Sequence, residues 1–188
     1  MFDTVRTLFF AEKTMTKQEL IADFIGNHQV AIRYIDALDA DRFHYRYQNK
    51  WTAGQQLEHI LRTIVPFSGA LVSKQFVEET FGKIDRATWD GATVLENYKK
   101  TSLQAPDRFL PKEQVLFEQK DALIADLHKQ LTTIGDLLGN YTEEELDTLT
   151  LPHPLLGKLT IREMFYLMAY HPLHHQKQLE QLLETYNT

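Results

Sequence analysis

Four long segments of this chain carry the hydrophobic spacing of amphipathic helices, and this pattern constrains the fold more than any other feature. Apolar residues recur at intervals of three, four or seven within residues 17–40, 53–79, 112–138 and 160–183. In the third segment the stripe consists of Leu116, Leu123, Leu127, Leu131, Ile134 and Leu138. The alternation typical of β-strands is nearly absent, so the pattern predicts an all-α chain.

The predicted helices have recognisable starts. A capping box, in which a Thr and a Glu or Gln three residues later each bind a free backbone N–H, precedes three of them. The boxes are Thr16–Glu19, Thr52–Gln55 and Thr160–Glu163. Pro111 and Gly139 bracket the third helix, and Thr142 predicts a further helical turn. Pro66 is expected to bend the second helix, because proline cannot donate a helical hydrogen bond.

Two connections matter for the architecture. Residues 82–110 form a long linker between the second and third helices, which we expect to pack on the bundle and to line a site. Residues 151–157 predict a stiff turn into the last helix. Four long helices with one long crossover predict a four-helix bundle, a fold that builds metal sites from facing side chains in its interior. Residues 1–188 are expected to form one domain.

Composition excludes several functions. The net charge of −6 and the pI near 5.7 argue against a nucleic-acid partner. No apolar run reaches the roughly 18 residues of a membrane span, and residues 1–6 lack the pattern of a signal peptide, so we expect a cytoplasmic protein. The chain has no cysteine, so a metal must be held by nitrogen or oxygen ligands. Any reactive thiol must arrive with a substrate.

Three histidines are the candidate metal ligands. His171 and His175 are four residues apart, which places them about 6 Å from each other on one face of a helix. His59 lies on another predicted helix, and three such ligands leave a coordination position open for chemistry. His174 points about 100° away from His175 and is expected at the flank of the site. The alternative is that His171 and His175 are interior histidines satisfied by hydrogen bonds.

Pro172 complicates this interpretation. It removes one helical hydrogen bond and biases His171 away from helical dihedrals. The resulting bend either tunes the site or moves His171 out of range.

Several other residues are candidates for supporting roles. Gln178, on the same face as the two histidines, is a candidate for orienting them, and Gln55 could reach the site although its capping role explains it. Tyr170 and Tyr166 could donate to a substrate, with core packing as the alternative for each. We expect Glu58 on a solvated helix face, Trp51 as a core anchor and His153 in a structural turn. His28, His44 and His128 have no partner that the sequence reveals.

Three motifs, taken together, resemble the DinB/YfiT-like superfamily of metal-binding four-helix bundles. They are WTAGQQLEHI at 51–60, HPLLGKLTIRE at 153–163 and HPLHHQKQ at 171–178. The resemblance spans nearly the whole chain and implies an up-down-down-up bundle, often a homodimer. It also implies a divalent metal, commonly zinc or nickel, bound by His59, His171 and His175. Pro172 departs from the smooth helical ligand pair of the family.

The resemblance also implies chemistry. Relatives include transferases that attach a low-molecular-weight thiol to a small electrophile, and thiol-dependent isomerases. We therefore expect a small-molecule thiol and an electrophile as partners. One alternative is a metal-dependent hydrolase that uses bound water, although residues 171–178 contain no Glu or Asp to serve as its general base. The other is a non-catalytic bundle that retains a vestigial site.

Overall fold

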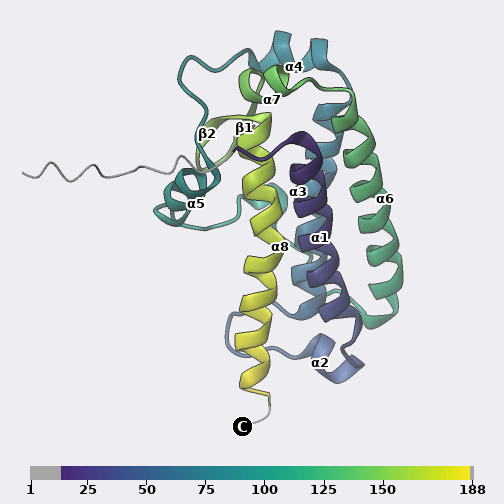
Figure 1. Ribbon diagram of the computed structural model, residues 1–188. Helices are drawn as coiled ribbons and strands as arrows, with labels where there is room; N and C mark the ends of the chain where they lie inside the picture. Colours follow the sequence, from purple (N-terminus) through teal and green to yellow (C-terminus); the bar gives the residue numbers. More distant parts are fainter. Residues whose placement is uncertain (1–13, 187–188) are drawn as a thin grey trace, which may run out of the picture.

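A computed structural model describes residues 14–186 of the chain. Its frame consists of four long helices that lie side by side: α1 (Lys17–Asp36), α3 (Ala53–Leu71), α6 (Lys120–Gly139) and α8 (Ile161–Glu184) (Figure 1). The shorter helices are α2 (Ala40–His44), α4 (Lys74–Phe81), α5 (Gly91–Lys99) and α7 (Glu143–Thr148), with 3-10 turns at Asp107–Phe109 and Phe117–Gln119. The chain is mostly helical, as predicted. The prediction that the chain lacks a signal peptide rests on residues 1–6, which lie outside the described residues.

Contacts at the helix ends give the directions of the four helices. Arg162, at the start of α8, binds the backbone just before α1, so these two helices begin at the same end. Lys120, at the start of α6, donates to the carbonyl of Asp36 at the end of α1 (2.7 Å). The hydroxyl of Tyr141, just after α6, donates to the carbonyl of Leu71 at the end of α3 (2.9 Å). Helices α1 and α8 therefore run opposite to α3 and α6.

The capping boxes form as the sequence predicts. The Thr16, Thr52 and Thr160 hydroxyls each accept from the backbone N–H three residues on, and the side chain there binds back to the threonine N–H. A fourth box at Thr142 starts α7. Inside the frame, the rings of Phe24, Phe67 and Phe165 meet with centroids 5.0–6.2 Å apart. These contacts bind α1, α3 and α8 into one core.

Several predicted boundaries are wrong. The segment 53–79 is two helices, because the Ser73 hydroxyl accepts from the N–H of Phe76 (3.1 Å) and starts α4. Pro66, for which a bend and not a boundary was predicted, lies inside α3. The third long helix begins at Lys120 and not near residue 112, because the preceding backbone is bound by side chains of α3.

The linker and the last turn contain structure that the sequence did not predict. Asp90 caps α5 inside the linker. The expected turn at 151–157 is a hairpin of two antiparallel strands, β1 (Thr150–His153) and β2 (Gly157–Thr160). Gly157 has a φ of 72°, a left-handed conformation that glycine adopts without a steric penalty. Helix α5 and this hairpin lie along one side of α8 (Figure 1).

The start of α8 is fixed by a salt-bridge cluster, made of the buried Arg162 and Glu163 and their more exposed charged partners. Arg162 donates to Asp147 (2.5 Å) and Glu143 (2.6 Å). Glu163 accepts from the Arg86 side chain (2.6 Å) and from the backbone N–H groups of Trp89 and Thr160. The cluster ties the linker and α7 to α8, and so holds the ligand helix in place.

None of the helices in the described part of the chain combines the length and the apolar character that crossing a membrane requires.

Candidate metal centre

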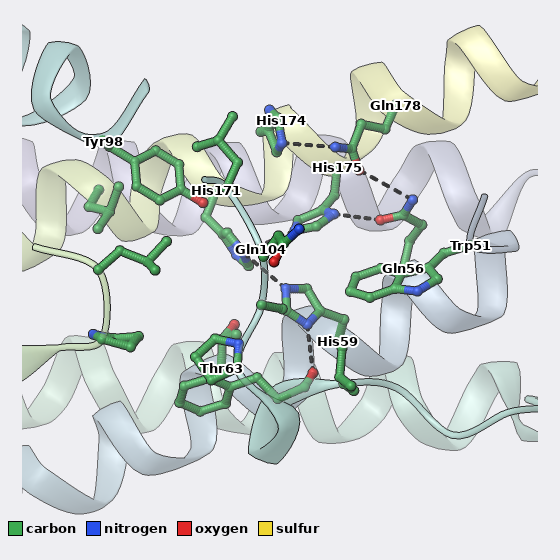
Figure 2. A pocket seen from close by; sticks show the side chains of 18 of the residues that line it. Trp51, Gln56, His59, Thr63, Tyr98, Gln104, His171, His174, His175 and Gln178 are labelled. Carbon is green, nitrogen blue, oxygen red and sulfur yellow. Dashed lines mark hydrogen bonds between the residues drawn. The ribbon is translucent and has the colours of Figure 1, made fainter. Parts of the chain in front are cut away.

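His59, His171 and His175 converge in the interior between α3 and α8 (Figure 2). The Nε2 atom of His171 lies 3.2 Å from that of His59 and 2.9 Å from that of His175. Each ring offers one nitrogen, all three nitrogens lie within 4.8 Å of one another, and all three side chains are buried. The three side chains together could hold a metal ion.

Hydrogen bonds on the far side of two rings orient them. Nδ1 of His59 lies 2.7 Å from the carbonyl oxygen of Phe109, and Nδ1 of His175 lies 2.5 Å from Oε1 of Gln56. Because an oxygen of this kind only accepts, each Nδ1 carries the proton and each Nε2 of the neutral ring keeps its lone pair. Two lone pairs thus face His171 Nε2. One proton on His171 can serve only one of them at a time, whereas a cation can bind all three nitrogens.

Burial keeps the three rings neutral. It lowers the pKa of His171 and His175 well below the ordinary value, and each is lowered further by a neighbouring histidine. The pKa of His59 is also lowered, mainly by burial. A neutral imidazole is the form that binds a metal, so the cluster is ready to act as a ligand set near neutral pH.

Pro172 does not displace His171. Helix α8 runs without interruption through the proline, and the side chains of His171 and His175 remain on one face. Of the two alternatives that the sequence left open, displacement out of range is therefore wrong.

Comparison with known proteins identifies the family of the chain. The sequence model of the DinB superfamily matches residues 27–179, a stretch that contains all three histidines. The chain belongs to the DinB superfamily. No curated protein and no solved structure matches it.

The supporting residues proposed for this DinB-superfamily chain lie in different places. Gln55 caps α3 and donates to the carbonyls of Lys112 and Glu113, and forms no hydrogen bond with the histidines. Gln178 donates to Nε2 of His174 (2.9 Å) and accepts from Gln56 (3.5 Å), and its side chain also acts on the pKa of His175, so it lies beside the cluster. His174 is thus beside the cluster and outside its ligand set, as expected.

Tyr170 packs against His174, with ring centroids 5.9 Å apart, and under the ammonium of Lys99 at 5.5 Å. It is not among the residues that line the cavity beside the histidines.

Two groups that orient the cluster were missed. Gln56 lies three residues before His59, so its helical spacing could have shown that it faces the site. The carbonyl of Phe109 had no such signal, because its position depends on how the linker folds back. The prediction for Glu58 is wrong: it is buried, and it accepts from the N–H of Lys112 (2.6 Å).

Two buried nitrogens, one beside the cluster and one on a ring of the cluster itself, lack hydrogen-bond partners. Nε2 of His28 and Nδ1 of His171 have no hydrogen-bond partner, and with Oε1 of Gln176 they are the only such buried side-chain atoms in the described residues. The Nδ1 of His28 binds the carbonyl of Phe24 (2.7 Å), which leaves its Nε2 as an acceptor. His28 is close enough to lower the pKa of His171 electrostatically.

A cavity of about 930 Å³ opens beside the histidines. Trp51 lines it: its ring lies 4.9 Å from that of His59 and stacks on that of His175 at 6.1 Å, so it serves the site and not only the core. Among the described residues that line the cavity there is no Asp or Glu. A cavity of this size accepts a drug-sized ligand.

Proposed function

We propose that the chain is a metal-dependent enzyme that activates a low-molecular-weight thiol for transfer to a small electrophile. His59, His171 and His175 would hold a divalent ion, zinc or nickel, both of which accept imidazole ligands. The homodimer that the resemblance implies stays a prediction.

One observation carries the proposal: the Nε2 atoms of three buried neutral imidazoles meet at 2.9 and 3.2 Å, and two of these rings donate their Nδ1–H away from the cluster. The donor set suits a borderline cation, and the outward hydrogen bonds fix the rings as such sites require. A divalent ion held by neutral imidazoles lowers the pKa of a thiol or water bound beside it.

The chain's own residues favour a thiol over water as the nucleophile. Hydrolysis at a site of this kind relies on a general base such as Glu, and no described Asp or Glu lines the cavity. A thiol, with an ordinary pKa of about 8.5, is far easier to deprotonate. The absence of cysteine means that this thiol is a substrate.

Metal analysis of the purified protein is the first test. We expect about one divalent ion per chain in the wild type and loss of it in His59→Ala and His175→Ala. His128→Ala, which changes an exposed histidine of α6, is the matched control and should keep the ion. A wild type that takes up no zinc or nickel would refute the proposal.

The second test mixes the metal-loaded protein with a panel of thiols and a chromogenic electrophile. Conjugation that requires both metal and thiol supports transfer. Cleavage of an ester or amide without thiol would replace the proposal with the hydrolase, and neither activity in a metal-loaded protein would favour the non-catalytic alternative.

A further inference from the structure

The histidine cluster divides its cavity into two unlike parts. Along α8, the cavity residues Met164, Leu167 and Met168 precede His171. The cavity residues that follow His175 are mostly polar: Gln178, Gln181, Leu182 and, just after the helix, Thr185. Because α3 runs in the opposite direction, its apolar cavity residue Phe67 lies toward the first group. Tyr98 and Trp51 accordingly lie on opposite sides of the histidines (Figure 2).

We call the first part the apolar lobe, lined by Phe67, Leu151, Leu155, Met164, Leu167 and Met168. The second is the polar mouth, lined by Gln48, Asn49, Lys50, Gln178, Gln181 and Thr185. A ligand that brings apolar surface into this lobe removes both its own surface and that of the lobe from water, and this burial stabilises the complex. The two parts therefore suit different reactants on either side of the histidines.

The apolar lobe also contains two hydrogen-bond donors. Nδ1 of His153 accepts from the N–H groups of Leu155 and Leu156, both at 3.2 Å. The proton of the neutral ring must then be on Nε2, which has no partner among the described residues. Burial lowers the pKa of His153 to about 4, so the ring stays neutral at physiological pH.

Tyr98 supplies the second donor. Its ring meets that of His153 edge to face, with centroids 6.0 Å apart, and its side chain extends toward His171 (Figure 2). Both residues line the cavity, and within the described residues the Tyr98 hydroxyl forms no hydrogen bond. Neither donor is among the buried unpaired atoms of the described residues, so both reach the open space of the cavity, where a ligand or water can accept from them.

We propose that the apolar lobe binds a compound with an apolar body and a carbonyl oxygen, and that Tyr98 and His153 donate hydrogen bonds to this oxygen. This compound is the electrophile of the proposed function, on which its role as a reactant rests. The polar mouth is left for the thiol. Tyr98 and His153 are specificity-determining residues, because they select an apolar molecule that carries an acceptor over one that does not.

A fluorescent naphthyl ketone, 6-propionyl-2-(dimethylamino)naphthalene, tests the binding directly. Its emission reports both an apolar environment and a hydrogen bond to its carbonyl. We expect saturable binding to the wild-type protein, with or without added zinc. Tyr98→Phe and His153→Asn should each weaken binding about fivefold, the effect of one hydrogen bond, and shift the emission to the blue. Asn at 153 keeps an acceptor for the turn in its Oδ1, and its shorter amide cannot place an N–H where the ring Nε2–H was.

Tyr47→Phe is the matched control, because Tyr47 lines the same cavity next to the polar mouth. Its dissociation constant should equal that of the wild type. Thermal unfolding of each variant separates lost binding from lost structure. The proposal is overturned if the ketone does not bind, if both donor variants bind it unchanged, or if Tyr47→Phe weakens binding as much as they do.

The binding assay and the proposed function can fail separately. Ketone binding is measured without metal or thiol, so it survives a negative metal analysis. Conversely, the protein could conjugate thiols only to polar electrophiles. That result would support the proposed function and contradict the proposal that the apolar lobe binds the electrophile.

Discussion

Helix α8 carries two polar clusters, one at its start and one near its middle, and the two differ in how their hydrogen bonds are completed. In the salt-bridge cluster, the charges of Arg162 and Glu163 are matched by opposite charges and backbone groups. In the histidine cluster, two lone pairs compete for one proton and Nδ1 of His171 is unpaired. A cluster that satisfies itself stabilises the fold, whereas one that does not is complete only with a ligand. Substitutions in each should therefore affect different measurements.

The largest expected effect is on metal affinity. His171→Ala removes one of three ligands, and we expect zinc affinity to fall by more than about 100-fold. This is more than the loss expected when a residue that only hydrogen-bonds to a ligand is replaced. Zinc at 100 times its dissociation constant should raise the free energy of unfolding of the wild type by about 2.7 kcal/mol and that of the variant by almost nothing. Isothermal titration calorimetry and urea unfolding measure both. His174→Ala is the control; equal loss there would contradict the ligand set.

Next in size is a loss of stability without a loss of metal. Glu163→Gln leaves the Arg86 charge without its buried partner, so we expect the free energy of unfolding to fall by about 3 kcal/mol. Zinc affinity should stay within about twofold of the wild type. The exposed Glu96–Lys100 pair is the matched control, and Glu96→Gln should leave the free energy of unfolding unchanged within error, because solvent screens the pair. If Glu163→Gln weakened zinc binding in its folded state, the two clusters would not be independent.

A smaller effect on affinity is expected from Gln56→Leu. The change removes the acceptor that orients His175, and such changes reduce metal affinity about 10- to 100-fold. Gln55→Leu is the informative neighbour. It removes a cap and should cost about 1 kcal/mol of stability while leaving zinc affinity nearly unchanged. Competition with a chelating dye gives the affinities. The reverse pattern in the two variants would show that the orienting residue has been misassigned.

The smallest effect per residue is the response to pH. Burial lowers the pKa of His28 and of His153 to about 4, whereas in the unfolded chain they titrate at the ordinary 6.5. Between these values the unfolded chain binds more protons, so metal-free protein should lose stability as pH falls from 6.5 toward 4. We expect roughly 1 kcal/mol from each histidine at pH 5.5. Urea unfolding at several pH values measures the slope.

The salt-bridge cluster should respond in a different range. The pKa of Glu143 is lowered, mainly by its hydrogen bond from Arg162, so its contribution is present above the ordinary 4.5 and is lost only below it. His28→Leu should reduce the loss of stability that occurs above pH 4.5, and it should leave the loss of stability below pH 4.5 unchanged. A stability that is flat between pH 6.5 and 5 would contradict the neutral state of the buried histidines.

The features that local sequence encodes were predicted well. Capping boxes located the starts of α1, α3 and α8, because the residues of a cap are three positions apart and act without the rest of the fold. The approach of His171 to His175 also follows from spacing on one helix.

Features that depend on distant contacts were not predicted. The burial of Glu58 and the carbonyl of Phe109 that orients His59 both depend on where the linker returns to α3. The late start of α6 has the same cause, since Gln55 binds the backbone that precedes it. Hydrophobic periodicity could not distinguish this segment from helix, because Val115 and Phe117 pack on the same core although Leu116 is exposed.

The separation between the histidines in the chain has a consequence for folding kinetics. His59 and His171 are 112 residues apart. An ion bound to both would act as a cross-link that closes most of the chain into a loop, whereas the unfolded chain offers only the local pair His171 and His175. The full site can form only after α3 and α8 have docked, so loading would follow folding. A loaded protein would have to release the ion before these helices separate, which would slow unfolding and protect the chain from proteases.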